Sequence, residues 1–386
     1  MARQQTKTLA RIMISTTLAF LTEAVAANSD QCPDKAELEG TCKNLSSDIS
    51  MNDLQAIGSH NSYKLAIPKP ELDLIRAYRE QSAITLDYTH LPLTEQLDLG
   101  LRQIELDILY DPEGGRYAEP LLPRQTGGQA GAVEYDNSDM HEPGFKVLHA
   151  QDIDVRSTCP TWITCLTEIR DWSDKNPEHV PILIMFNAKT GRSAYPDSKA
   201  ALDFSEAAFD ALDVETLRVF PRSKLITPDD VRGNAKTLRE AILRRDWPSL
   251  NESRGKVFFA LDEGPGKVKL YMRGNASLEG LPMFVNSINT EADHAAYFTI
   301  NDPIQDQQRI RTTVSAGFIV RTRADANTIE ARENTTSRRE AALNSGAHYV
   351  STDYYLPRPD FSEYSVYLPA TSAARCNPIR LPAACN

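Results

Sequence analysis

The amino-acid sequence predicts an α/β fold and, within that class, a TIM (β/α)8 barrel. Two observations support this prediction. Short apolar runs, too continuous for half-exposed strands, recur along the whole chain, and segments with helical spacing or Pro/Gly-rich loops separate them. In addition, the glycine-rich nucleotide turn expected after the first strand of an open doubly wound sheet is absent. Eight buried parallel strands alternating with helices favour a closed barrel.

The expected elements follow one another along most of the chain. We expect strands at 54–58, 103–109, 146–148, 182–186, 257–261, 283–286, 318–322 and 349–352. The helical spacing is clearest at 161–176, 198–212, 306–315 and 335–344. Residues 111–144 are rich in glycine, proline and acidic side chains and show no helical period. We expect them to form a long loop that is functional or flexible.

The first 26 residues have the features of a secretory signal peptide. Three basic residues precede the apolar run 12–21, and Ala24-Val25-Ala26 offers a cleavage site. The apolar run is too short to span a membrane comfortably. We therefore expect a secreted mature chain, 27–386, that forms one barrel domain with its core at about 50–357.

The cysteines agree with an oxidising compartment. Their number is even. The chain has no C-x-x-C pair, which weighs against a zinc or redox site. Their spacing suggests local disulfides that tie down N- and C-terminal extensions, although the sequence permits other pairings. The suggested pairs are Cys32–Cys42, Cys159–Cys165 and Cys376–Cys385. Four glycosylation sequons begin at Asn44, Asn251, Asn275 and Asn334.

The charge of the chain excludes some partners. The formal net charge is −11, and removal of the three basic residues and Glu23 of the signal peptide brings it to −13. So acidic a chain is a poor candidate for binding nucleic acid or for docking non-specifically on anionic membranes.

Reactive side chains follow the first two predicted strands, where a TIM barrel carries its active site. The first strand ends at His60 and Asn61, which could also simply cap a loop. The second strand places Glu105 and Asp107 on one face, because side chains alternate along a strand. A hard divalent cation would relieve the repulsion between the two carboxylates. The alternative is a polar strand end with Arg102 as the counter-charge.

The next two strands add further polar groups. His149 ends the third strand, and two histidines can share general acid and general base work, although a histidine at a strand end is often structural. Asn187 and Lys189 follow the fourth strand, where the amide could bind a cation and the ammonium a phosphate, unless Asn187 serves the turn. Further polar residues are expected round the rim, as salt-bridge partners or substrate contacts: Asp262, Arg321, Arg323, Asp325, Asp353 and Tyr354.

These motifs resemble those of the PLC-like phosphodiesterases, which share a first-strand histidine, a second-strand E-x-D and a second histidine. The local sequences A-I-G-S-H-N-S-Y-K at 56–64, L-G-L-R-Q-I-E-L-D-I at 99–108, F-K-V-L-H at 145–149 and Y-V-S-T-D-Y-Y at 349–355 look most like the calcium-dependent phosphatidylinositol-specific phospholipase C family. The resemblance covers roughly residues 50–357.

The resemblance implies a cofactor and roles for individual residues. Ca²⁺ would be bound by Asn61, Glu105, Asp107 and Asn187, although an amide at 187 replaces an acidic ligand of related phospholipases C. His60 would stabilise the pentavalent phosphorus or act as the base and His149 would protonate the departing oxygen, or the two roles would be exchanged. Candidate substrate contacts are Lys189, Arg321, Arg323 and Tyr354, and Glu105 joins the histidines in the catalytic group.

The implied activity is cleavage of inositol phospholipids by attack of an inositol hydroxyl, with transient contact to a membrane surface. Two other activities stay open: a glycerophosphodiester phosphodiesterase, which usually has Arg-Gly after the first histidine where this chain has Asn61-Ser62, and a phospholipase D-like lyase. A secreted barrel that has lost its activity is the third alternative.

Overall fold

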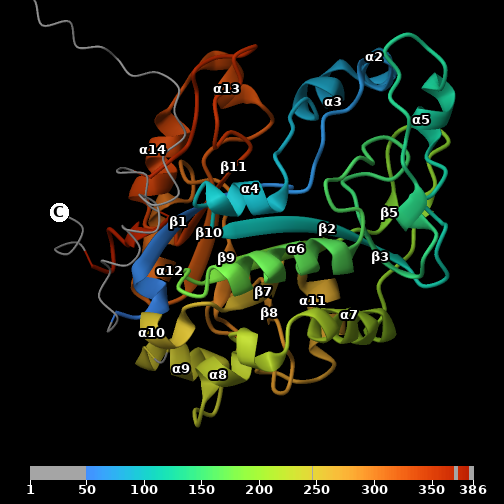
Figure 1. Ribbon diagram of the computed structural model, residues 1–386. Helices are drawn as coiled ribbons and strands as arrows, with labels where there is room; N and C mark the ends of the chain where they lie inside the picture. Colours follow the sequence, from blue (N-terminus) through green and yellow to red (C-terminus); the bar gives the residue numbers. More distant parts are fainter. Residues whose placement is uncertain (1–48, 246, 369–372, 382–386) are drawn as a thin grey trace, which may run out of the picture. The chain divides into compact units, whose positions relative to one another are not determined.

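The computed structural model describes residues 49–245, 247–368 and 373–381, which belong to one compact unit. Its centre is a barrel of parallel strands surrounded by helices (Figure 1). Within the described residues, no helix combines the length and the apolar character needed to cross a bilayer.

Eight parallel strands form the barrel, in the order β8-β7-β4-β2-β1-β11-β10-β9. A parallel bridge between Asn286 and Tyr297 joins the two ends of this series and closes the ring. The strands are β1 Leu54–Ser59, β2 Gln103–Asp111, β4 Ile182–Ala188, β7 Val257–Leu261, β8 Phe284–Val285, β9 Tyr297–Thr299, β10 Ile319–Arg323 and β11 Tyr349–Thr352. The predicted TIM barrel is therefore confirmed.

One predicted barrel strand is wrong and one barrel strand was not predicted. The expected strand at 146–148 corresponds to β3 (Gly144–Val147), which pairs antiparallel with the far end of β2, from Ile108 to Asp111. It extends a hairpin beyond the barrel and takes no place in the ring. The missing place belongs to β9, which has only three residues and therefore gave too short an apolar pattern to recognise.

Short strands outside the ring accompany the loops. β5 (Gly191–Arg192) and β6 (Ala200–Ala201) form a small antiparallel hairpin, and β12 (Arg375–Cys376) pairs antiparallel with the start of β1. The pairing of β12 brings residues near the C-terminus against the bottom of the barrel.

Helices follow most of the strands. The helices that precede β7 along the chain are α2 Lys69–Tyr78, α3 Glu80–Thr85, α4 Leu93–Asp98, α5 Leu121–Thr126, α6 Trp162–Lys175, α7 Glu206–Val219, α8 Pro228–Arg232, α9 Leu238–Arg244 and α10 Leu250–Ser253. After β7 come α11 Pro265–Met272, α12 Gln307–Ser315, α13 Ile329–Glu333 and α14 Ser337–Asn344. Single 3-10 turns occupy Met51–Asp53, Ser138–Met140 and Arg222–Lys224.

Helix capping explains where the predicted helices begin. Thr161 accepts a hydrogen bond from the Thr164 amide and so starts α6 at Trp162, as the spacing predicted. The helix expected at 198–212 instead begins at Glu206, because Ser205 caps it and the preceding residues form the β5-β6 hairpin. The helices expected at 306–315 and 335–344 correspond to α12 and α14.

The loop that follows β2 is mostly irregular, as predicted, but contains the short helix α5. Leu122 of α5 is fully buried and belongs to a small apolar cluster with Ile67, Ile75 and Ala83. Figure 1 shows α2, α3 and α5 gathered on one side of the barrel. The apolar cluster therefore holds this part of the loop against α2 and α3.

Among the described cysteines, one pair is bonded. Cys159 and Cys165 form the predicted disulfide at the start of α6. Cys376 is buried, and its predicted pair with Cys385 stays a prediction because Cys385 is not among the described residues. Cys32, Cys42 and Cys385 lie outside the described residues.

Candidate functional site

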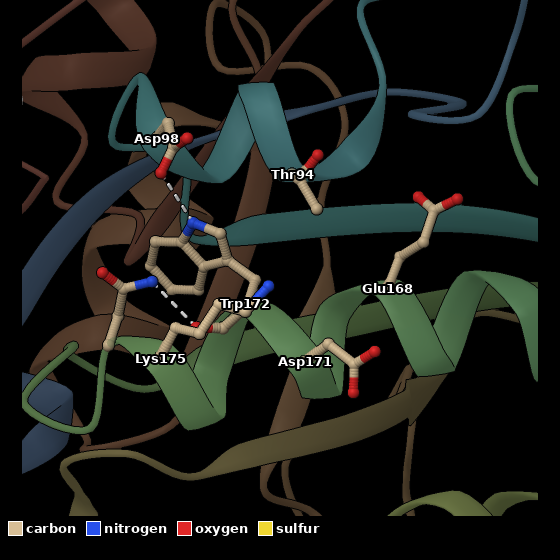
Figure 2. A pocket seen from close by; sticks show the side chains of 7 residues that line it. Thr94, Asp98, Glu168, Asp171, Trp172 and Lys175 are labelled. Atoms are coloured by element: carbon tan, nitrogen blue, oxygen red, sulfur yellow. Dashed lines mark hydrogen bonds between the residues drawn. The ribbon is translucent and has the colours of Figure 1, made fainter.

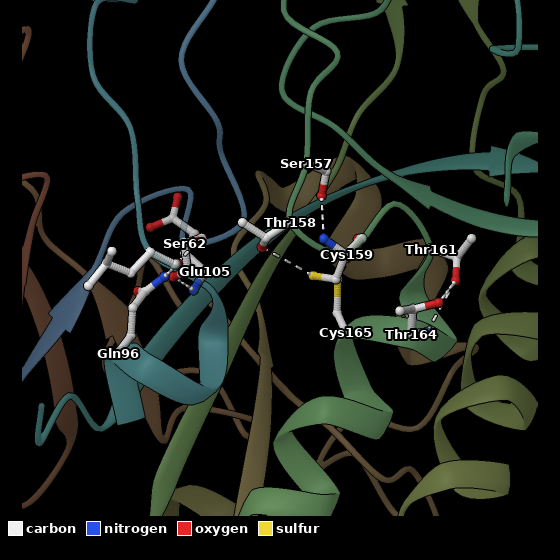
Figure 3. Close-up of a disulfide and its surroundings, with 10 residues drawn as sticks. Ser62, Gln96, Glu105, Ser157, Thr158, Cys159, Thr161, Thr164 and Cys165 are labelled. Atoms are coloured by element: carbon white, nitrogen blue, oxygen red, sulfur yellow. Dashed lines mark hydrogen bonds between the residues drawn. A yellow bond between two sulfur atoms is a disulfide. The ribbon is translucent and has the colours of Figure 1, made fainter. Parts of the chain in front are cut away.

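The loop after β1 is anchored by a network of buried hydroxyl and amide groups. The Ser62 amide donates to the Glu105 carbonyl (2.9 Å), and the Glu105 amide donates to Ser62 Oγ (2.8 Å) (Figure 3). Gln96 of α4 donates to the Ser62 carbonyl at 2.6 Å. Asn61 adopts a left-handed backbone (φ 49°), which asparagine tolerates better than most residues. The network fixes the loop against the adjacent strand β2.

His60 is held between an acidic and a basic residue. Its Nδ1 lies 2.8 Å from Asp353 Oδ1, just after β11, and its Nε2 lies 3.3 Å from Arg323 Nη1, at the end of β10. Because a guanidinium can only donate, Nε2 must accept and Nδ1 must carry the proton. The Nε2 of a neutral His60 therefore carries the lone pair, and it lies toward Arg323 and Glu105.

The electrostatic surroundings keep His60 neutral. Burial and then the positive charge of Arg323 lower the pKa of His60 to about 3, against the opposing effect of Asp353. Asp325 lies beneath Asp353, with its Oδ1 accepting from the Asp353 amide at 2.9 Å, and burial raises the pKa of Asp325 to about 7. A neutral imidazole with a lone pair on Nε2 has the form required of a general base.

The two carboxylates predicted on β2 lie on the inner face of the barrel, each with its own cation. Arg321 Nη2 lies 2.6 Å from Glu105 Oε2, and Lys189 Nζ lies 2.9 Å from Asp107 Oδ2. Arg102, considered as their counter-charge, instead donates to two backbone carbonyls and stacks over Trp172. The counter-charges come from β10 and from the end of β4.

Glu105 and Asp107 differ in their surroundings. Burial, together with the nearby Asp107, raises the pKa of Glu105 to about 7, while Arg321 opposes this shift. Asp107 also accepts from the Tyr63 hydroxyl at 3.0 Å, but its Oδ1 is buried and has no hydrogen-bond partner. An orphaned carboxylate oxygen at this position is available to a cation.

The oxygen donors at the site fit calcium, which prefers carboxylates and amide carbonyls. Asn61 is buried and donates through Nδ2 to the Tyr88 hydroxyl (2.7 Å), and Asn187, beside Asp107 in the sheet, donates through Nδ2 to the Asp262 carbonyl. Their amide oxygens complement the orphaned Oδ1 of Asp107. Within the described residues, no three histidine, cysteine or carboxylate side chains come together in a metal-binding group, so such a site depends on the amides.

His149 comes from the hairpin beyond the ring, because β3 is not a barrel strand. Its Nδ1 lies 2.8 Å from Asp154 Oδ2, and its side chain is 23% exposed. The prediction that His149 ends a barrel strand is therefore wrong. The second histidine is positioned by a loop.

Tyr354, a predicted substrate contact, lies in an aromatic cluster. Its ring is buried and packs near Phe361 and Tyr364.

Two residues that were not predicted support His60. Tyr88 stacks on His60, and His90 donates from Nε2 to the His60 carbonyl at 2.8 Å. Both lie in an irregular segment whose sequence has no pattern to mark them.

A separate hollow lies between α4 and α6, away from every predicted site residue (Figure 2). Trp172 donates to Asp98 at 2.8 Å across it. The lining residues are Thr94, Asp98, Glu168, Asp171, Trp172, Lys175 and Asn176.

A TIM barrel whose rim combines two histidines with an E-x-D pair has the layout of a PLC-like phosphodiesterase. A scan of protein families agrees: the model described as "Phosphoinositide phospholipase C, Ca2+-dependent" matches residues 49–378. The match spans most of the chain, and the chain belongs to this family of phosphodiesterases. No curated protein matches the sequence significantly.

Solved structures give the same fold. A calcium-dependent phosphoinositol-specific phospholipase C from Pseudomonas sp., described with a myo-inositol complex, is similar with a TM-score of 0.53 and 18% identity, over 89% of this chain and 99% of that chain. A second crystal form of the Pseudomonas protein has the same TM-score and identity, over 86% and 97%. At this identity the likeness bears on the fold alone.

Proposed function

We propose that the chain is a phosphatidylinositol-specific phospholipase C that cleaves the bond between phosphorus and the glycerol oxygen of inositol phospholipids. The observation that carries the proposal is the neutral His60, whose Nε2 lies 3.3 Å from Arg323 Nη1 and 3.8 Å from Glu105 Oε1. Family membership supplies the substrate class.

The arrangement favours His60 as the base and His149 as the acid. His60 Nε2 takes the proton of an inositol hydroxyl, whose oxygen forms a bond to phosphorus while the bond from phosphorus to the glycerol oxygen breaks. His149 donates a proton to that departing oxygen. The products are diacylglycerol and a cyclic inositol phosphate. An internal hydroxyl aligned with phosphorus has the proximity advantage of an intramolecular nucleophile.

The cations at the rim give the substrate phosphate its place. Arg323 lies 3.3 Å from the reacting nitrogen of His60, so a phosphate bound to its guanidinium is next to the base. Lys189 is one-third exposed and can exchange Asp107 for a phosphate oxygen. Arg321 is almost fully buried and orients Glu105.

Calcium would be bound by Asn61, Glu105, Asp107 and Asn187. When bound, it neutralises non-bridging phosphate oxygens and acidifies the attacking hydroxyl. The buried, unpartnered Oδ1 of Asp107 supports this assignment. Lys189 and Arg321 already pair with the two carboxylates, so Asp107 would share its charge between Lys189 and a bound ion.

The test is turnover of phosphatidylinositol vesicles by residues 27–386 with Ca²⁺, with EGTA, and with the variant His149→Ala, using phosphorus NMR to identify the product. We expect a cyclic inositol phosphate that requires calcium and is lost in the variant. The control is His141→Ala, which removes an exposed histidine on the other side of β3 and should keep full activity. Turnover only of glycerol or choline phosphodiesters would assign the chain to a sibling activity, and no turnover of any substrate would indicate an inactive barrel.

We also propose that the chain is exported. The signal-like N-terminus and the disulfide between Cys159 and Cys165 support export. A lipid substrate then requires contact with a membrane surface outside the producing compartment.

A further inference from the structure

Lys64, four residues after His60, is a fully buried lysine. Its Nζ donates to the carbonyls of Tyr88 (3.1 Å) and Leu65 (3.3 Å), and it lies 4.6 Å from the centre of the Tyr88 ring. The side chain is 0% exposed. A buried ammonium is costly unless an anion balances it. The anion is Asp154, whose Oδ1 lies 3.4 Å from Lys64 Nζ.

Asp154 faces Lys64 with one oxygen and His149 with the other. Its Oδ2 lies 2.8 Å from His149 Nδ1, and the side chain is 1% exposed. Burial alone would raise the pKa of Asp154, but Lys64 and His149 together hold it below its usual value. Asp154 is therefore an anion with no contact to solvent and with one partner on each side.

The backbone joins the two loops at the same place. The Leu65 amide donates to the Arg156 carbonyl (3.1 Å), and the Thr158 amide donates to the Tyr63 carbonyl (2.8 Å). Ala150 and Asp154 exchange two backbone hydrogen bonds, of 3.0 and 2.9 Å, which fold His149 and Asp154 into one tight turn. The disulfide then fixes the end of this segment to α6 (Figure 3). The loop of His60 and the loop of His149 thus share one buried ion pair.

We propose that Lys64 and Asp154 are positioning residues for His149: the buried ion pair fixes the imidazole with Nδ1 bonded inward and Nε2 directed to the leaving oxygen, in register with the loop of His60. The inference rests on the proposed function. Neither side chain touches substrate. Asp154 accepts from Nδ1–H, so Nε2 is the nitrogen left to hold and release the catalytic proton. Lys64 holds the carboxylate in that orientation.

The test compares two leaving groups in the variants Asp154→Asn and Lys64→Met. The glycerol oxygen of a lipid substrate departs as an alkoxide and needs a proton. The 4-nitrophenolate of a nitrophenyl ester of inositol phosphate departs without one. We expect kcat of Asp154→Asn to fall about 100-fold or more on phosphatidylinositol and less than about tenfold on the nitrophenyl ester. Lys64→Met should change the ratio of the activities on the two substrates in the same direction by a smaller factor. Equal losses on both substrates would overturn the proposal.

A matched control comes from the same segment. Arg156 pairs with Glu71 at 2.7 Å, which ties the segment to α2 without contacting His149. Glu71→Gln should leave the ratio of the two activities unchanged, and a shift as large as that of Asp154→Asn would contradict the proposal. If Lys64→Met does not fold, the double variant Lys64→Met/Asp154→Asn removes both charges together. Its ratio should equal that of Asp154→Asn, since the two residues act through one contact, and a further multiplicative loss would count against the pairing.

A spectroscopic measurement separates this proposal from the proposed function. The ¹⁵N shifts of the His149 ring report which nitrogen carries the proton in the neutral state. We expect protonated Nδ1 in the unchanged chain and a redistribution to Nε2 in Asp154→Asn. An unchanged distribution would overturn the positioning role. The expected redistribution in a chain that is inactive on all phosphodiesters would contradict only the proposed function.

Discussion

Asp353 determines which nitrogen of His60 carries the proton. One of its oxygens accepts from His60 Nδ1–H, and the other lies 3.1 Å from Arg323 Nη2. Asp353→Asn leaves one side-chain oxygen, which accepts from Arg323, so the NH₂ group faces His60 Nδ1. Because an NH₂ group can only donate, Nδ1 must accept and the imidazole proton moves to Nε2. We expect kcat on phosphatidylinositol to fall about 10²- to 10⁴-fold with little change in KM.

Steady-state kinetics and thermal unfolding of Asp353→Asn together check this expectation. A similar melting temperature with the lowered kcat assigns the loss to the tautomer of His60. A variant with full activity would show that Asp353 does not control the base.

Asn187 is the residue that departs from the acidic pattern expected of the family. If its amide oxygen contacts calcium, Asn187→Asp adds a charge to the ligand set and should tighten calcium binding about tenfold, or about 1.4 kcal/mol. Asn187→Ala should weaken binding. Isothermal titration of the purified chain with Ca²⁺ measures both. Asn176→Asp, at the end of α6, is the control, and affinities that stay equal in all variants would exclude Asn187 as a ligand.

At the scale of elements, α7 carries a carboxyl group whose ionisation opposes folding. Glu215 packs against β3, and burial raises its pKa from 4.5 to about 7 although the Phe145 amide and Lys146 oppose the shift. A pKa raised in the folded state means that the protonated form stabilises the fold. That stability is present below pH 4.5 and is lost as the pH rises to about 7.

Glu215→Gln removes this loss while keeping an acceptor for the Phe145 amide. We expect the variant to be more stable than the unchanged chain at pH 8 by about 1 kcal/mol, a value reduced because Glu215 is partly exposed, and equally stable near pH 4.5. Melting temperatures across this pH range measure the difference. Glu206→Gln, exposed in the first turn of α7, should show no such trend, and a constant offset at every pH would contradict the prediction.

The elements also show what a sequence can reveal. Seven of the predicted strands are in the ring, because long apolar runs such as β4 are buried on both faces whatever their neighbours are. The direction of β3 is set by its pairing with the extended end of β2, and its apolar residues look the same in either direction. The three residues of β9 are placed by tertiary contacts that leave no local pattern.

The candidate site follows the same division. The E-x-D spacing placed Glu105 and Asp107 on one face, since alternation along a strand is a local property. The partners of these groups are distant in sequence: Glu105 and Arg321 are 216 residues apart. Pairings of this kind depend on ring order, so Lys189, Arg321 and Arg323 were expected at the rim without their individual contacts.

At the scale of the whole molecule, the barrel brings chemistry from both halves of the chain to one base. His60 comes from β1, and its two partners come from β11, which pairs directly with β1, and from β10, which pairs with β11. The pairing of β1 with β11 joins the first barrel strand of the sequence to the last. That pairing is therefore a condition for the tautomer of His60, and with it for the proposed activity.

Export affects the whole molecule through its disulfide. The chain with its own N-terminus, expressed in a secreting host, should appear in the medium beginning at Ala27, with Cys159 and Cys165 oxidised. The same chain without residues 1–26 should stay in the reducing cytosol with both thiols free. Because the bond closes a short loop with a sequence separation of 6, we expect the reduced form to be less stable by about 2 kcal/mol.

Intact-mass spectrometry with thiol alkylation and thermal unfolding of the two preparations measure these differences. The double variant Cys159→Ala/Cys165→Ala, secreted in the same way, should melt like the reduced chain, because it lacks only the cross-link. Retention of the full-length chain inside the cell, with residues 1–26 attached, would contradict export. Equal melting temperatures of the oxidised and reduced chains would contradict the expected stabilisation and would show that α6 and its preceding segment hold together without the bond.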